Sequence, residues 1–138
     1  MDIVCTRKPW TRMGRMGETS KMIKVTGGKP HERFLTRSVV GECYGHFRLS
    51  PHLVEVRVSL DSYKAIGCSG SCLEGETEHS YDIQISTEQT VRDFVATIVH
   101  EMVHVNQWET GEWDEDGEDE ADYYQYRLTD KLWKKGAL

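Results

Sequence analysis

Two segments of the chain alternate apolar and polar residues with a period of two. They span residues 54–60 (Val-Glu-Val-Arg-Val-Ser-Leu) and 81–86 (Tyr-Asp-Ile-Gln-Ile-Ser). Because successive side chains of a strand point to opposite faces, both segments are predicted to be strands with one buried face. Residues 47–49 (Phe-Arg-Leu) predict a third, shorter strand.

Apolar residues recur at helical spacing farther along the chain and predict two neighbouring helices. The first is expected to run from Thr87 to about Trp108, with Ser86 as the N-cap of a capping box. After a polar turn bracketed by Gly111 and Gly117, the second is expected to return against the first. The inward residues are Val91, Phe94, Val95, Ile98, Met102 and Val105 in the first helix, and Ala121, Gln125, Leu128 and Leu132 in the second.

A shorter helix is predicted nearer the N-terminus. It follows the turn Gly-Gly-Lys-Pro at residues 27–30 and is expected to span His31 to Val40. The predicted order of elements is typical of an α+β fold. We expect a small antiparallel or mixed sheet packed against the 87–108 helix and the C-terminal helix. The residues of the short helix expected to face this sheet are Phe34, Leu35, Ser38 and Val39.

The length and composition of the chain indicate one compact domain spanning residues 1–138. Of the 138 residues, 38% are hydrophobic and 29% are charged, so the chain can bury a modest core. No apolar run approaches the roughly 20 residues that a membrane-spanning helix requires. The N-terminus also lacks the basic and then apolar layout of a signal peptide. We therefore expect a cytoplasmic protein with no membrane partner.

The formal net charge of −6 conceals an uneven distribution. Residues 1–33 contain eight Lys or Arg against three Asp or Glu, whereas residues 109–122 contain nine acidic side chains and no basic one. The basic segment could bind nucleic acid or an acidic partner, could fold back on the acidic loop, or could be a solvated terminus. The last interpretation is favoured, with residues 1–30 as a partly mobile segment, because no nucleic-acid-binding motif accompanies the basic residues.

Four cysteines are present, at positions 5, 43, 68 and 72. Without a secretory signal, reduced thiols are the expected state. Cys68 and Cys72 lie in a Gly/Ser-rich connection, where they could form a local disulfide or, with His79 or Cys43, half of a structural metal site. The thiol interpretation is favoured because the chain has no second cysteine pair with the spacing of a zinc ribbon.

The most specific chemical signal is the sequence His100-Glu101-Met102-Val103-His104 inside the predicted 87–108 helix. Side chains four residues apart lie on the same face of a helix, so both imidazoles can bind one metal ion. Zinc held by three protein ligands keeps a position for water, and a carboxylate at the second position of the motif can accept a proton from that water. Glu101 is therefore the candidate general base, and His100 and His104 are candidate zinc ligands.

A third ligand is expected after Gly111, where acidic residues are dense. Glu118 and Asp122 are four residues apart on the predicted C-terminal helix, so both carboxylates lie on one face. Glu118 could bind the metal while Asp122 accepts the outer N–H of a ligating histidine. The residues alone leave other candidates open, namely Glu112, Asp114, Glu115, Asp116, Asp119 and Glu120.

The segment His100-Glu101-x-x-His104, followed by Glu118-x-x-x-Asp122, resembles the H-E-x-x-H plus E-x-x-x-D arrangement of the gluzincin metallopeptidases, a group of zincins. That group contains thermolysin and the HtpX-like and ImmA/IrrE-like proteases. The resemblance covers about residues 81–130 and implies a zincin-like domain with Glu118 as the third zinc ligand and Asp122 supporting a histidine. The layout is also similar to that of small SprT-like proteases, whose third ligand is usually a downstream histidine, but no histidine follows His104.

The resemblance implies a zinc-dependent metalloendopeptidase that acts on a protein or peptide substrate. Such enzymes commonly hold an extended substrate along the strand that precedes the active helix. The backbone of Ile83, Gln84 and Ile85 is therefore the candidate substrate edge, and an internal strand with both edges occupied is the alternative. Candidates for stabilising the oxyanion are Tyr123, Tyr124 and His79.

The sequence leaves two other classes of function open. In the first, zinc ties two helices together in a non-catalytic protein- or nucleic-acid-binding module, but such a site needs no general base. In the second, a metal-free interaction protein, His100 and His104 are ordinary core residues. The combination of paired histidines, Glu101 and the E-x-x-x-D segment favours the peptidase.

Overall fold

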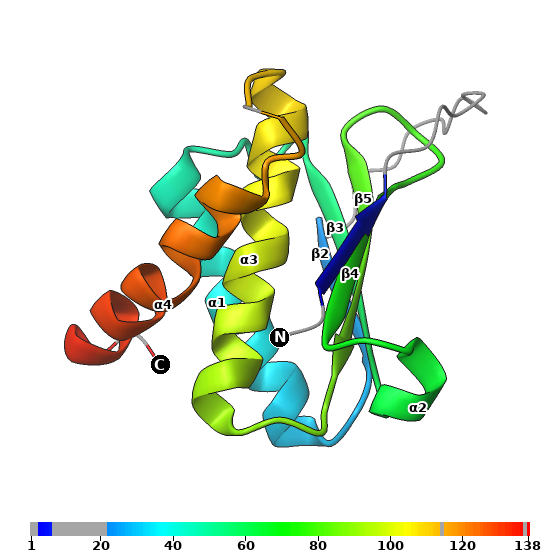
Figure 1. The fold of residues 1–138 in the computed structure, drawn as a ribbon, viewed down its shortest axis with the longest axis vertical. Coiled ribbons are helices and arrows are strands. Elements are labelled where there is room, and N and C mark those ends of the chain that lie inside the picture. The colour runs from blue at the N-terminus through cyan, green and yellow to red at the C-terminus, as the bar shows by residue number, and fades with distance from the viewer. Residues whose placement is uncertain (1–2, 7–21, 114, 137) are drawn as a thin grey trace.

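The computed structural model describes residues 3–6, 22–113, 115–136 and 138, with only the backbone of residues 3–6. The basic segment 1–30 therefore lies largely outside the described residues. Within them the chain alternates between short strands and helices (Figure 1). The elements are β1 (Ile3–Thr6), β2 (Ile23–Gly27), α1 (Pro30–Phe47), β3 (Glu55–Asp61), α2 (Tyr63–Ile66), β4 (Gly70–Glu74), β5 (Ser80–Ser86), α3 (Val91–Thr110) and α4 (Glu118–Lys134).

The strands form one mixed sheet in the order β1-β4-β5-β3-β2. β4 runs antiparallel to β5, while β1–β4, β5–β3 and β3–β2 are parallel pairs. Helices α1, α3 and α4 lie on one side of this sheet, with α3 next to it and α4 farther out (Figure 1). The expectation of an α+β fold with a small mixed sheet is therefore confirmed.

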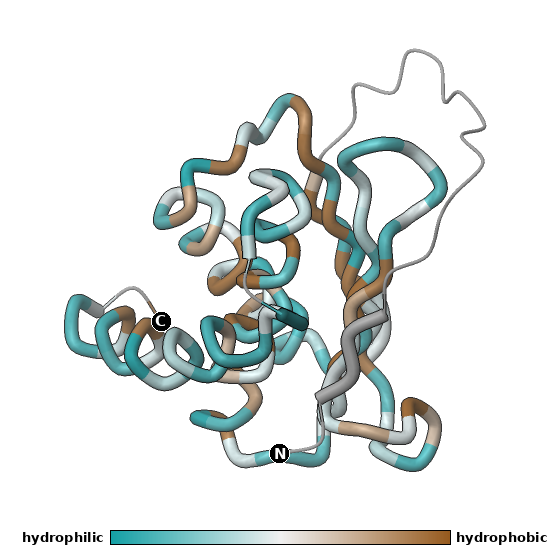
Figure 2. Tube along the Cα trace, turned by 45° about the horizontal axis from the view of Figure 1, so that its top comes forward, coloured by the Kyte–Doolittle hydropathy of each residue, from teal (hydrophilic) through white to brown (hydrophobic). Residues whose placement is uncertain are grey.

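The two faces of the sheet differ in polarity. Ile83 of β5 lies between Val58 of β3 and Cys72 of β4, and all three side chains are buried beneath the helices. The opposite face carries polar residues, including an ion pair between Arg57 Nε and Asp82 Oδ1 at 2.8 Å. Hydrophobic residues accordingly run through the middle strands and along the helices that cover them (Figure 2). The alternation of apolar and polar residues in the strands thus indicates which face of the sheet the helices cover.

The two strands predicted from alternation are observed as β3 and β5, to within one residue at each end. The strand predicted at residues 47–49 is wrong. Phe47 instead ends α1, and Arg48 adopts a left-handed conformation (φ 58°) that caps this helix. Residues 68–72 were expected to lie in a Gly/Ser-rich connection, but Gly70, Ser71 and Cys72 pair with β5 and belong to β4. Glycine and serine are poor strand formers, so this strand depends on its pairing.

Helix α1 is longer than predicted, and its inward face agrees with the expectation in part. Val39 is buried as expected, and Leu35 packs against the core. The buried residues of this helix include Val39, Val40, Cys43 and Tyr44, whereas Phe34, expected to point inward, is 71% exposed. The additional turns carry Cys43 and Tyr44, and the Tyr44 hydroxyl donates a hydrogen bond to the buried carbonyl of Val54 at 2.5 Å. The buried face of the helix therefore continues beyond the predicted end, from Val39 to Tyr44.

Helix α3 begins four residues later than predicted. Ser86 still belongs to β5, where its N–H bonds to the carbonyl of Ser69. Thr90 is the true N-cap, because its hydroxyl accepts from the N–H of Asp93 at 3.1 Å. Helix α4 and its inward residues are as expected, with Thr129 also buried.

None of the helices in the described part of the chain combines the length and the apolar character needed to cross a membrane.

Helix α3 approaches β4 closely at Gly70. A Cβ atom built on Gly70 would lie 2.5 Å from the Thr97 methyl carbon. We expect Gly70→Ala to lower the free energy of unfolding by about 1–3 kcal/mol, because the added methyl overpacks the contact. Gly41→Ala is the control, since a Cβ there meets nothing within 4 Å inside α1. It should raise stability by about 0.8–1 kcal/mol, and chemical denaturation measures both changes. Equal effects of the two variants would contradict the close approach.

Candidate metal centre

The middle of α3 carries three buried polar residues. His100 is 1% exposed, Glu101 0% and His104 2%. Helix α3 is enclosed by the sheet and α1 on one side and by α4 on the other, so its polar residues as well as its apolar ones lose contact with solvent. Burial of three such side chains is costly unless each one is satisfied by a partner, and the contacts of α3 with α4 include such partners.

His100, His104 and Glu118 converge at the start of α4. Nε2 of His100 lies 3.0 Å from Oε1 of Glu118, and Nε2 of His104 lies 2.8 Å from Oε2 of the same carboxylate. Among the described residues these three form the one group of His, Cys, Asp and Glu able to hold a metal ion, with their ligand atoms within 4.8 Å of one another. The Glu118 side chain is 33% exposed, so the group reaches solvent through this carboxylate.

The turn between α3 and α4 sets the position of Glu118. Gly111 ends α3 in a left-handed conformation (φ 73°), and Gly117 starts α4 in another (φ 80°). A Cβ atom on Gly117 would lie 2.3 Å from Oε1 of Gln107, so glycine is required there by close approach as well as by conformation. Asp116 also accepts a hydrogen bond from the N–H of Glu118 at 3.0 Å. The third ligand candidate is thus placed by a tightly specified turn.

Gln107 connects His104 to this turn. Its Nε2 donates to the carbonyl of Gly117 at 2.9 Å and to Oε1 of Glu120 at 2.8 Å. The amide oxygen therefore faces Nδ1 of His104, at 2.8 Å, and accepts a hydrogen bond from it. One buried amide fixes both the ring of His104 and the residue that precedes Glu118.

Gln125 does the same for His100. Its Oε1 lies 2.7 Å from Nδ1 of His100. The backbone carbonyl of Gln125 accepts a hydrogen bond from the Thr129 hydroxyl, one turn later in α4. Asp122, predicted for this role, is 64% exposed and lies 3.5 Å from the same nitrogen. Asp122 therefore adds negative charge near the ring, but Gln125 makes the shorter contact.

These contacts determine which nitrogen of each histidine carries the proton and which one carries the lone pair. An amide oxygen only accepts hydrogen bonds, so His100 and His104 both carry a proton on Nδ1. In the neutral imidazole the lone pair is then on Nε2, and both Nε2 atoms face the carboxylate. Two imidazole nitrogens and one carboxylate oxygen that converge in this way fit the ligand preferences of zinc.

Burial lowers the pKa of His100, and the neighbouring His104 lowers it further. The hydrogen bond to Gln125 and the carboxylates of Glu118 and Asp122 act in the opposite direction, but with a smaller effect. The net shift favours the neutral ring, which is the form able to bind a metal ion.

Two of the three oxyanion candidates make their described contacts elsewhere. Nδ1 of His79 lies 2.9 Å from both oxygens of Glu109, at the end of α3, and the Tyr81 hydroxyl donates to the same carboxylate. Tyr124 packs edge-on against Phe47 at the end of α1, at a ring separation of 5.8 Å. These contacts tie together secondary-structure elements and do not place either side chain beside Glu118.

Tyr123, the third oxyanion candidate, is 56% exposed, and its ring lies beneath the guanidinium of Arg127.

The other acidic residues considered as metal ligands, where the structure describes them, are not part of the group formed by His100, His104 and Glu118. Among them Asp114 lies outside the described residues, Glu112, Glu115, Asp116, Asp119 and Glu120 are not part of the three-residue cluster, and Glu120 binds Gln107.

The proposed substrate edge is wrong. Ile83, Gln84 and Ile85 belong to β5, which is hydrogen-bonded to β3 on one side and to β4 on the other. A peptide cannot add to a strand whose two edges are occupied. The sequence does not reveal this, because alternation reports which face of a strand is buried and not whether its edges are paired.

Cys43 and Cys68 are free thiols. Cys43, Cys68 and Cys72 are all buried, and Cys68 donates a weak hydrogen bond from its thiol to the carbonyl of Gly70. The expectation of reduced thiols is therefore confirmed for Cys43 and Cys68. Cys72 lies in β4, with Ile83 as its neighbour in β5.

Two residues that contact the histidines, Gln107 and Gln125, were not assigned a role from the sequence. Gln125 was expected only as an inward position of α4, and Gln107 was not singled out. A glutamine three residues after the second histidine is a usable signal, since that spacing allows a contact along one helix face. Gln125 reaches His100 across the helix interface, which no local pattern indicates.

Comparison of the chain with models of protein families, with curated protein sequences and with solved structures found no match. The interpretation of the site therefore depends on its own residues and geometry.

The role of Gln107 can be tested without any metal. We expect Gln107→Met to lower the free energy of unfolding by about 1–3 kcal/mol, because it leaves the buried Nδ1–H of His104 without its acceptor. The carbonyl of Gly117 keeps a hydrogen bond from the N–H of Ala121. Denaturation is measured in the presence of a chelator. Gln84→Met, on the exposed face of β5, is the matched control and should change stability by less than about 0.5 kcal/mol. Similar losses in both variants would show that Gln107 has no special role.

Proposed function

We propose that the protein is a zinc-dependent metalloendopeptidase with a zincin-like arrangement of its active helix. One observation carries this proposal, namely the convergence of His100, His104 and Glu118, with Glu101 between the two histidines on α3. The α+β fold with a mixed sheet behind α3 is compatible with such a domain. The hydrogen bonds that His104 and His100 donate to Gln107 and Gln125 are of the kind that orients metal ligands in zinc enzymes.

In this proposal His100, His104 and Glu118 hold the zinc ion. When bound, the ion supplies a Lewis acid that polarises the scissile carbonyl and makes a water molecule more acidic. Gln107 and Gln125 keep both rings turned with Nε2 toward the ion. Glu118, which comes from a different helix, makes the ligand set depend on the docking of α4.

Glu101 serves as the general base and then as the general acid. Its carboxylate accepts a proton from the water that attacks the carbonyl carbon. It then delivers that proton to the amide nitrogen as the C–N bond breaks, so that the products are a carboxylate and an amine. Because Glu101 is 0% exposed, its carboxylate acts in an environment with little bulk water, which strengthens electrostatic interactions.

The main competing function is a non-catalytic module that zinc holds together. A structural zinc site normally has four protein ligands, whereas the group found in the described residues has three. A three-ligand site has room for water, and a carboxylate between the ligating histidines has a use only if that water reacts. These two features favour the catalytic proposal over the structural one.

The substrate in this proposal is a protein or a peptide. Since β5 is internal, the backbone of its residues does not hold that substrate by strand addition. The proposal therefore places substrate recognition on other parts of the molecule, which need not select peptides in general.

Metal content is the first test. Elemental analysis of protein purified without a metal-binding tag should find one zinc per chain, and none in His100→Ala/His104→Ala. Glu118→Ala should bind zinc about 10-fold or more weakly, because one of three ligands is lost. Asp119→Ala is the control, since this exposed carboxylate follows Glu118 but is outside the cluster. A wild-type protein that stays free of zinc after reconstitution at neutral pH would contradict the proposal.

Glu101→Gln separates chemistry from metal binding. We expect this variant to keep one zinc ion but to lose peptide hydrolysis by about 100-fold or more, because an amide cannot accept the proton of the attacking water. The assay compares wild type and variant on a broad peptide library, with new termini identified by mass spectrometry. Equal cleavage by the two proteins would show that the activity comes from a contaminant or from a different base.

A further inference from the structure

The outward face of α4 is divided by charge. Residues such as Ala121, Leu128 and Leu132 point to the core, and the opposite side of the helix is exposed. Its first half carries the exposed acidic residues Asp119, Glu120 and Asp122, and its second half carries Arg127, Lys131 and Lys134. Figure 1 shows α4 at the outside of the molecule, separated from the sheet by α1 and α3. Within the described structure, this face is therefore open to a partner.

Two large aromatic side chains lie on the same exposed side. Tyr123 is 56% exposed and Trp133 is 53% exposed. Exposed aromatic residues of this size are typical anchors of protein interfaces, where they bury much area at a low cost in side-chain entropy. The face thus combines apolar anchors with separated charges.

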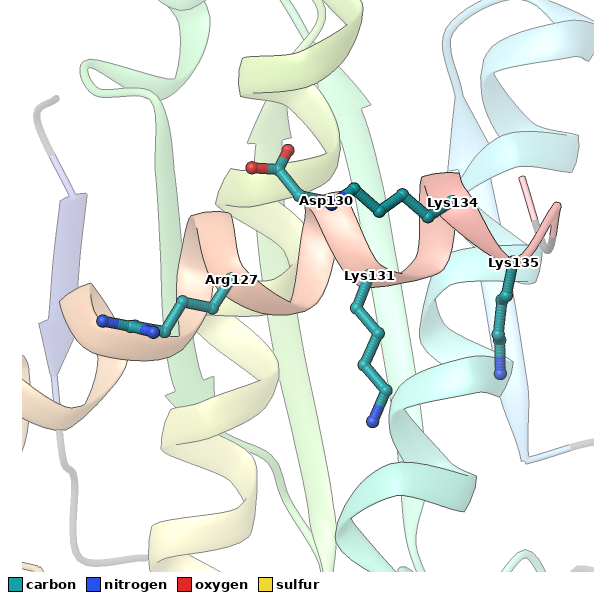
Figure 3. A pocket seen from close by; sticks show the side chains of 5 residues that line it. All are labelled: Arg127, Asp130, Lys131, Lys134 and Lys135. Carbon is teal, nitrogen blue, oxygen red and sulfur yellow. The ribbon is translucent and has the colours of Figure 1, made fainter.

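The basic half of this face does not have the form of a small-anion site. A hollow of about 530 Å³ is lined by Arg127, Asp130, Lys131, Lys134 and Lys135. In Figure 3 these side chains spread in different directions along the helix and do not turn toward a common point. Asp130 is also held by Arg92 at 3.0 Å, and Lys135 by Glu42 at 2.9 Å. Such a row of cations fits an extended acidic surface better than a single phosphate.

We propose that this surface binds α4 of a second copy of the chain. The two helices run antiparallel about a two-fold axis that passes between Tyr126 and Arg127. The acidic half of each helix then faces the basic half of the other, so one surface is complementary to itself, as a symmetric dimer requires. The chain itself thus supplies the extended acidic surface that the basic half fits.

The spacing of two residues supports this arrangement. Asp119 and Lys134 are the eighth residues on either side of the proposed axis, and both lie near the middle of the exposed face of α4. In an antiparallel pair, Asp119 of each chain therefore approaches Lys134 of the other. Tyr123 and Asp130, the fourth residues on either side, approach each other in the same way.

The helix dipole explains only part of this pattern. It favours acidic residues in the first turn and basic residues in the last turn of any helix. It does not require Asp122 or Arg127, which lie farther in, and it does not favour the exposure of Tyr123 and Trp133. A docking surface accounts for the charges and the aromatic residues together.

Charge reversal tests the proposal by analytical ultracentrifugation over a range of protein concentrations. The wild-type protein should dimerise reversibly and more weakly at high salt. Asp119→Lys and Lys134→Glu should each raise the dimer dissociation constant about tenfold or more, because each reversal places like charges together at two symmetric contacts. Lys64→Glu, an exposed reversal on α2, is the control and should leave it unchanged.

Mixing the two variants gives the decisive result. Asp119→Lys and Lys134→Glu are each impaired alone, but one chain of each kind restores opposite charges at both contacts. An equimolar mixture should therefore form a heterodimer with nearly wild-type affinity. A monomeric wild-type protein, a dimer insensitive to both reversals, or a mixture that stays monomeric would each overturn the proposal. These outcomes are independent of zinc content and of hydrolysis.

Discussion

The structure depends on a polar contact buried between two helices. His100 and His104 are almost completely removed from solvent, and their polar atoms meet Gln107, Gln125 and Glu118. Removing such groups from water is unfavourable unless each finds a partner, so the contact is stable only in a narrow range of geometries. That restriction explains the turn before α4, where Gly117 leaves no space for a side chain against Gln107.

Much of the fold could be predicted from the sequence. The alternation at residues 54–60 and 81–86 gave β3 and β5, and the helical spacing gave α3 and α4, because these elements bury one continuous stripe or face. β4 could not be found in this way, since Gly70 and Ser71 owe their extended conformation to β5 and not to local preference. Pairing of edges also made β5 internal, which a single segment cannot reveal.

The candidate metal ligands were easier to predict from the sequence than the residues that hold the histidine rings in place. The spacing of His100 and His104 places both rings on one helix face, and Glu118 was indicated by the resemblance of its E-x-x-x-D segment. The structure brings the three side chains together. The partners of the rings were harder to assign, because the chain offered Asp122 at a suitable helical spacing while Gln125 lies closer in space. A carboxylate and an amide can both accept the same proton, so the choice between them depends on how α4 is rotated against α3, which the sequence does not specify.

The origin of the three converging side chains has a mechanical consequence. β5 is paired with a strand on each side and leads within a few residues into α3, so the two histidines lie on a helix that directly follows an internal strand. Glu118 belongs to α4, which lies farther from the sheet (Figure 1). An ion bound by all three would link α3 to α4, and its binding energy would stabilise the packing of α4. Loss of the ion would then first allow α4 to unfold locally, while the sheet stayed intact.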